Sequence, residues 1–167
     1  HKLIIRSSFD KAAREAVLAR NKAFKTALNS EEKLKFLADL LKQTSEKTLV
    51  FTLHNDLVYK ISKRFLIPAI TYQTPLRERR ETLYKFKTGE YRAVVTSQVL
   101  DEGIDVPDAS LGVILSGTGS HREFVQRLGR LLRKREGKVA RLIEVVSRET
   151  TEMRLSTRRH RRPSDAA

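Results

Sequence analysis

Short apolar segments that favour strands alternate with amphipathic segments that favour helices, and this alternation constrains the fold more than any other feature of the sequence. Strands are predicted at residues 48–53, 68–72, 92–96, 111–115 and 138–146. Helices are predicted at residues 10–28, 30–43, 56–64, 75–88 and 121–134, and from about residue 148 onward. Strands that alternate with helices pair in parallel, so we predict an α/β fold with a mostly parallel sheet and helices on both faces.

Two local signals set the limits of the predicted helix at 75–88. Thr74 is expected to be its N-cap, with proline at the first helical position, and Gly89 is expected to end it. In parallel α/β sheets, ligands bind beyond the carboxyl ends of the strands. Functional groups are therefore expected just after Phe51, Val95 and Leu115.

Composition narrows the class of partner. The chain has 167 residues and a net charge of +14, with a sequence pI near 10.4, which favours nucleic acid or another polyanion. The absence of cysteine excludes disulfides and thiolate metal sites, and the four histidines show no ligand spacing, so no metal site is predicted. The sequence has no membrane-length apolar run and no signal peptide. We therefore expect an intracellular protein with no membrane partner.

The two ends differ from the predicted domain at 30–153. Residues 1–29 are basic and helical, and they form either a linker from an upstream segment or an extension packed on the domain. High charge and low apolar content favour the linker. Because the chain begins with histidine rather than methionine, a fragment or a processed product is expected. Residues 154–167 form a basic tail, which is either a nucleic-acid-binding arm or a solvated helix end.

An arginine-rich segment at 126–133 is the most informative stretch. A capping box of S-x-x-E form at 120–123 predicts the helix at 121–134. On such a helix, Gln126, Arg130 and Arg133 fall at i, i+4 and i+7 and share one face. Guanidinium groups stay charged and fork onto phosphate oxygens. Taken alone, however, an arginine cluster is more typical of a solvated basic face.

A second segment at 96–107 gathers carboxylates in an otherwise basic protein. Gly103 allows a backbone shape that other residues resist, and Pro107 ends any regular element. A solvated acidic turn is the ordinary interpretation. A metal site is less favoured, because no histidine ligand is nearby.

These two segments resemble motifs of the superfamily 2 helicases. The pattern Q-R-x-G-R-x-x-R at 126–133 resembles motif VI, and Thr96 with the G-x-D-x-P run at 103–107 resembles motif V. Residues 48–55 look like the looser motif IV. The glutamine that opens motif VI and the stretch at 71–89 are similar to the xeroderma pigmentosum group B helicases. The resemblance covers about residues 30–147, and it implies the second of two RecA-like domains in a 3′-to-5′ DNA helicase or translocase of repair and transcription.

The resemblance also implies roles for particular residues. Arg130 and Arg133 would reach the γ-phosphate of ATP, while Gly103, Asp105, Gln126 and Arg127 would line the nucleotide side of the cleft. The residues implied to contact the DNA backbone are Thr52, Thr74, Arg79, Thr96 and Ser97.

The implied cofactors are ATP and Mg²⁺, held mainly by the first RecA-like domain. The chain contains no G-x-x-x-x-G-K-[ST] sequence, so it has no P-loop lysine for the phosphates, and we expect it to hydrolyse no ATP by itself. The implied partners are DNA, bound without sequence preference, the first helicase domain, and repair or transcription proteins.

Two other classes of protein remain open. One is a non-enzymatic basic α/β module that binds nucleic acid or a protein. The other is a superfamily 2 motor that acts on RNA or as a nuclease subunit.

Overall fold

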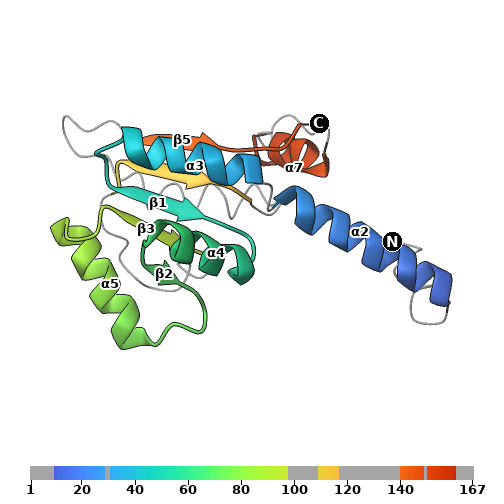
Figure 1. The fold of residues 1–167 in the computed structure, drawn as a ribbon, viewed down its shortest axis with the longest axis horizontal. Coiled ribbons are helices and arrows are strands. Elements are labelled where there is room, and N and C mark those ends of the chain that lie inside the picture. The colour runs from blue at the N-terminus through green and yellow to red at the C-terminus, as the bar shows by residue number, and fades with distance from the viewer. Residues whose placement is uncertain (1–9, 29–30, 98–108, 117–139, 149, 161–167) are drawn as a thin grey trace, which may run out of the picture.

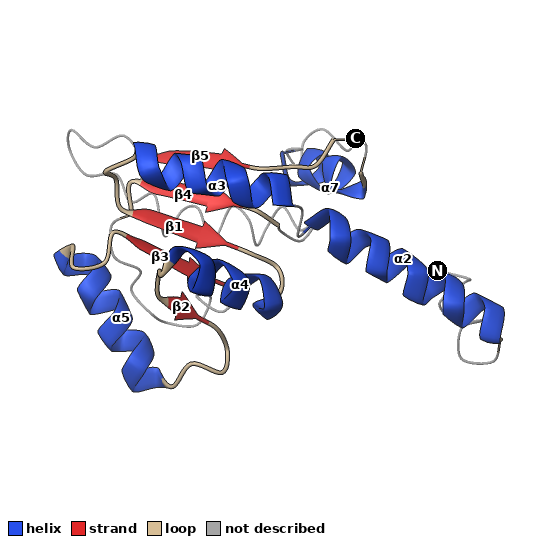
Figure 2. Ribbon diagram, viewed as in Figure 1, coloured by secondary structure: helices blue, strands red, loops and turns tan. Residues whose placement is uncertain are grey.

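The computed structural model describes residues 10–28, 31–97, 109–116, 140–148 and 150–160. Its centre is a five-stranded sheet in which every neighbouring pair is parallel, with the order β2-β3-β1-β4-β5. Figure 2 shows the strand arrows all pointing the same way. The strands are β1 (Thr48–Phe51), β2 (Ala69–Ile70), β3 (Ala93–Thr96), β4 (Leu111–Ile114) and β5 (Arg141–Glu144). The prediction of a parallel α/β sheet is confirmed.

Helices lie on both faces of this sheet (Figure 1). The described helices are α2 (Lys11–Leu28), α3 (Glu31–Gln43), α4 (Asn55–Phe65), α5 (Leu76–Thr88) and α7 (Thr151–His160). The predicted helix at 121–134 lies outside the described residues. Figure 1 also shows α7 beside the carboxyl end of β5, and α2 extending away from the sheet. Helix α2 contacts α7.

Two apolar cores, one on each face, hold the helices to the sheet. Successive strand residues point to opposite faces, so the neighbours Leu49 and Val50 of β1 enter different cores. The core that contains Val50 includes residues of α3 and α4, and the core that contains Leu49 includes residues of α5. The amphipathic patterns of these helices therefore place α3 and α4 on one face and α5 on the other.

Helix α5 ends as predicted but begins differently. Gly89 has a φ of 90°, and its N–H donates to the carbonyls of Lys85 and Phe86, so the prediction that glycine ends this helix is confirmed. The prediction that Thr74 is the N-cap is wrong, because Pro75 holds that position. The hydroxyl of Thr74 instead accepts a hydrogen bond from the Thr71 N–H at 2.9 Å and closes the turn that follows β2.

The C-terminal helix crosses the predicted end of the domain. We predicted a boundary between residues 153 and 154, and α7 continues from Thr151 through His160. The first part of the predicted tail is therefore helical. The remainder, at 161–167, lies outside the described residues.

An exposed ion pair links the start of α3 to the end of α4. Glu31 pairs with Arg64, and more distantly with Lys60 at 3.5 Å. The hydrogen bond from Arg64 holds the pKa of Glu31 below its ordinary value of 4.5. Because the folded-state pKa is lowered, the pair stabilises the fold above the ordinary glutamate pKa. That stabilisation is lost as the pH falls through the lowered value.

An NMR titration of the Glu31 carboxyl carbon is expected to give a midpoint below 4.5. Arg64→Gln should return the midpoint toward the ordinary value, because the hydrogen bond from Arg64 is the largest cause of the shift. Lys60→Gln should have a smaller effect and serves as the control. An unchanged midpoint in Arg64→Gln would show that the pair does not form in solution.

Candidate nucleic-acid interface

A row of buried hydroxyl groups follows the strands at the carboxyl edge of the sheet. Thr71 follows β2, Thr96 ends β3 and Ser97 follows it, Thr52 follows β1, and Ser116 lies two residues after β4. All five residues are buried. Because the strands are parallel, their carboxyl ends meet at one edge, and these side chains follow one another across it in strand order.

Hydrogen bonds between neighbouring strands fix this edge. The Thr52 N–H donates to the Thr96 carbonyl at 3.0 Å, and the Leu53 N–H donates to the Ser116 hydroxyl at 2.8 Å. The Ser97 N–H donates to the Ile70 carbonyl at 3.3 Å. The loops that leave β1, β3 and β4 are therefore held to one another at the points where they begin.

Ser97 differs from its neighbours in how its hydroxyl is used. The Thr52 hydroxyl donates to the His54 carbonyl at 3.1 Å, and the Thr96 hydroxyl donates to the Ser97 carbonyl at 2.8 Å. The Ser97 hydroxyl is buried and has no hydrogen-bond partner within the described part of the chain. A buried polar group left in this way costs about 1–3 kcal/mol, so this hydroxyl is a candidate for contact with a ligand.

The other two residues that we predicted to contact DNA are Thr74, in the turn between β2 and α5, and Arg79, near the start of α5. The Arg79 side chain donates through Nη2 to the carbonyls of Thr71 and Thr74, at 3.2 and 3.4 Å. Its buried Nε has no partner among the described residues. Tyr59 reaches the same turn, where its hydroxyl lies 3.1 Å from the Thr71 hydroxyl. The Nη2 group of Arg79 therefore stabilises this turn through its two hydrogen bonds.

The structure thus brings Thr52, Thr96 and Ser97 together at one edge, with Thr74 in the turn that follows β2 and Arg79 on α5, hydrogen-bonded to that turn. Sequence reasoning predicted functional groups just after Leu115, where Ser116 lies, but it named neither Ser116 nor Thr71 as a site residue. Thr71 directly follows β2, and Ser116 lies two residues after β4. A hydroxyl residue just after an apolar strand is the signal that could have identified them.

The residues implied to contact nucleotide lie outside the described residues; they are Gly103, Asp105, Gln126, Arg127, Arg130 and Arg133. The segments that carry them begin at this same edge, because residue 98 follows Ser97 and residue 117 follows Ser116.

A buried ion pair fixes the end of β4 and the start of α7. The Lys33 ammonium lies 2.6 Å from both carboxylate oxygens of Glu152 and donates to the Leu115 carbonyl at 2.7 Å. The Ser147 N–H donates to the same carboxylate at 2.9 Å. Both charged side chains are only 4% exposed. The pair therefore joins α3 and α7 to Leu115, the residue that follows β4.

Two further observations concern the part of the chain that the structure describes. No group of three histidine, cysteine, aspartate or glutamate residues there could hold a metal ion. None of its helices is both long enough and apolar enough to cross a membrane.

Comparison with known proteins identifies the family to which this chain belongs. The family model of the helicase conserved C-terminal domain matches residues 32–135. The chain therefore belongs to this family of helicase C-terminal domains. The C-terminal domain of the DEAD-box protein Dbp5 has the same fold, with a TM-score of 0.65, 19% identity, and coverage of 78% of this chain and 77% of that one.

Curated relatives narrow the class to proteins of the XPB type. The DNA 3′-5′ translocase XPB2 of Sulfurisphaera tokodaii is 49% identical over 160 residues, which cover 95% of this chain and 36% of the relative. The DNA 3′-5′ helicase XPB of Mycobacterium tuberculosis is 36% identical over 73% of this chain and 23% of its own length. The XPB subunit of the general transcription and DNA repair factor IIH of Drosophila melanogaster is 34% identical, over 75% of this chain and 17% of the relative.

These relatives confirm the resemblance to the xeroderma pigmentosum group B helicases. The chain spans about a third of the length of XPB2 and less of the other two.

Proposed function

We propose that this chain is the second RecA-like domain of an ATP-dependent 3′-to-5′ DNA helicase or translocase that acts inside the cell in DNA repair or transcription. Residues 30–153 would form the motor domain, 1–29 a linker helix and 154–167 a basic tail. The XPB-type relatives and the net charge of +14 support this function.

The nucleotide would lie between this domain and a first RecA-like domain of the same polypeptide. ATP supplies the phosphoryl group whose developing charge the guanidiniums of Arg130 and Arg133 would stabilise. Gly103, Asp105, Gln126 and Arg127 would line the same side of the cleft. Mg²⁺ would be held on the first domain.

The observation that carries the DNA-binding part of the proposal is the Ser97 hydroxyl. Among the described residues it is buried without a hydrogen-bond partner, at an edge where β1, β3 and β4 end together. Serine and threonine hydroxyls and backbone N–H groups are common donors to phosphate oxygens, and such contacts carry no base code. Thr52, Thr74, Arg79, Thr96 and Ser97 would therefore hold the DNA backbone without reading its sequence.

Ser97→Ala separates a ligand contact from a structural role. In the full-length protein, this change is expected to weaken DNA binding about tenfold, because a hydrogen bond to a charged group contributes about 1.5–3 kcal/mol. The melting temperature should stay the same or rise, because the lost hydroxyl has no partner in the described part of the chain. Fluorescence anisotropy with labelled DNA and thermal unfolding measure the two effects.

Thr96→Val is the matched control for the effect on stability alone, because the Thr96 hydroxyl already donates to the Ser97 carbonyl. It should lower stability by about 1 kcal/mol. If Ser97→Ala lowers the melting temperature as much as Thr96→Val and leaves DNA affinity unchanged, the proposed backbone contact is wrong.

A further inference from the structure

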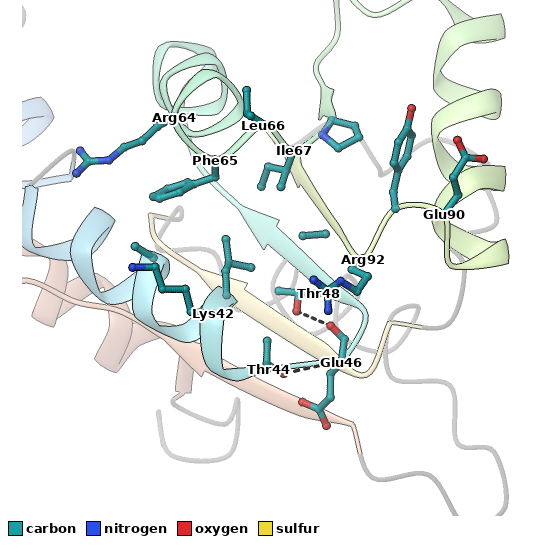
Figure 3. Close-up of a pocket in the computed structure, with 15 residues that line it drawn as sticks. Lys42, Thr44, Glu46, Thr48, Arg64, Phe65, Leu66, Ile67, Glu90 and Arg92 are labelled. Atoms are coloured by element: carbon teal, nitrogen blue, oxygen red, sulfur yellow. Dashed lines mark hydrogen bonds between the residues drawn. The ribbon is translucent and has the colours of Figure 1, made fainter.

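A pocket lies at the opposite edge of the sheet from the proposed DNA contacts. Its volume is about 530 Å³, within the range of ligand pockets. It opens where α3 and α4 end and where β1, β2 and β3 begin, and Figure 3 shows the residues around it. The motor function proposed above assigns it no role.

One side of the pocket is apolar. Leu41, Phe65, Ile67 and Pro68 line it, and Phe65 and Ile67 are only partly buried. Figure 3 shows Phe65 at the end of α4 and Ile67 on the connection that leaves this helix, with Arg92 on the side of β3. The pocket therefore offers apolar contacts and a cation to the same occupant.

Leu66, at the pocket, combines two unfavourable properties. Its φ is 53°, in the left-handed region where glycine is normally found, and its residue surface is 90% exposed. A large apolar residue held in this conformation at a surface costs stability without gaining burial. Strained residues of this kind cluster at ligand clamps, so Leu66 is a candidate contact for a partner.

The unpaired charge of the pocket is positive. Three of its charged residues are paired: Arg64 with Glu31, Glu46 with Arg141 at 2.6 Å, and Glu90 with Lys85 at 3.5 Å. Lys42 and Arg92 are exposed and make no ion pair within the described part of the chain. A ligand with an apolar group and negative charges would therefore complement the pocket.

We propose that this pocket docks an acidic segment of a partner protein that carries one bulky apolar side chain. The apolar side chain would lie against Phe65, Ile67 and Leu66, and flanking carboxylates would pair with Lys42 and Arg92. This site is separate from the motor function, so either proposal can fail while the other stands.

The test is a selection of randomised nonapeptides on the 167-residue chain, followed by measurement of affinity for the enriched peptides. Enriched peptides should share one bulky apolar residue flanked by aspartate or glutamate. Lys42→Glu with Arg92→Glu should weaken binding of these peptides about tenfold or more, because each attraction becomes a repulsion. Lys35→Glu with Lys87→Glu makes the same charge change on exposed residues that do not line the pocket and should leave binding within about twofold.

A second variant, Leu66→Gly, controls for unfolding. Glycine is favoured at a φ of 53°, so the melting temperature should stay the same or rise, while peptide affinity falls about tenfold with the loss of the apolar contact. No enrichment, enrichment without acidic residues, or equal binding by Lys42→Glu with Arg92→Glu would overturn the proposal. The proposal would also be overturned if Lys42→Glu with Arg92→Glu lowered DNA affinity as much as it lowers peptide affinity. Failure of the full-length protein to bind the peptides would overturn it as well.

Discussion

Arg130→Ala in the full-length protein is expected to lower DNA-stimulated ATP hydrolysis about 10³-fold or more, while DNA affinity stays within about threefold of wild type. The reason is that a guanidinium on the transferred phosphoryl group acts on charge that develops only in the transition state. Steady-state release of phosphate, with and without DNA, measures the first quantity. Fluorescence anisotropy measures the second.

Arg130→Lys tests whether geometry or charge matters. Lysine keeps the positive charge but loses the planar fork, so we expect most of the ATPase activity to be lost as well. Arg77→Ala removes an exposed arginine with no predicted role and should leave the rate near wild type. Near-normal activity of Arg130→Lys, or equal loss of ATPase and DNA binding in Arg130→Ala, would favour a basic module that acts through its summed charge.

Glu152→Ala should lower the free energy of unfolding by about 3–5 kcal/mol, because it leaves the buried Lys33 ammonium without its counter-charge. The Ser147 N–H also loses its acceptor. Urea denaturation followed by circular dichroism measures this change. Lys33→Met combined with Glu152→Leu should recover most of the loss, since an apolar pair of similar volume leaves no unpaired buried charge.

The exposed pair of Arg141 and Glu46 supplies the matched control. Its atoms also lie 2.6 Å apart, but the Arg141 side chain is 58% exposed, so Glu46→Ala should cost less than about 1 kcal/mol. If Glu152→Ala costs no more than Glu46→Ala, the carboxylate is hydrated in solution, and α7 does not depend on the pair.

The regular elements could be predicted because their signals are local. The apolar run at 48–53 and the amphipathic pattern of α3 can each be recognised from a few neighbouring residues. The Lys33–Glu152 pair could not be predicted, because its partners lie 119 positions apart. Lys33 in the first turn of an amphipathic helix is indistinguishable, in sequence, from a solvated lysine.

The candidate interface could be predicted in part for a related reason. Thr52, Thr96 and Ser97 lie where buried strands end, and a parallel sheet must bring those ends together. The role of Thr74 could not be read from its neighbours, because a threonine before proline suits a helix cap and a turn equally well. The structure uses its hydroxyl for the turn that begins at Thr71.

The most direct test of the two-domain account is a crystal structure of the full-length protein with DNA and a transition-state analogue of ATP, ADP–aluminium fluoride. The account predicts that the guanidiniums of Arg130 and Arg133 lie about 2.7–2.9 Å from the fluoride ligands that replace the γ-phosphate oxygens. It also predicts that the P-loop around the nucleotide belongs to a different domain. A nucleotide held entirely by one domain, with both arginines facing solvent or DNA, would contradict the account.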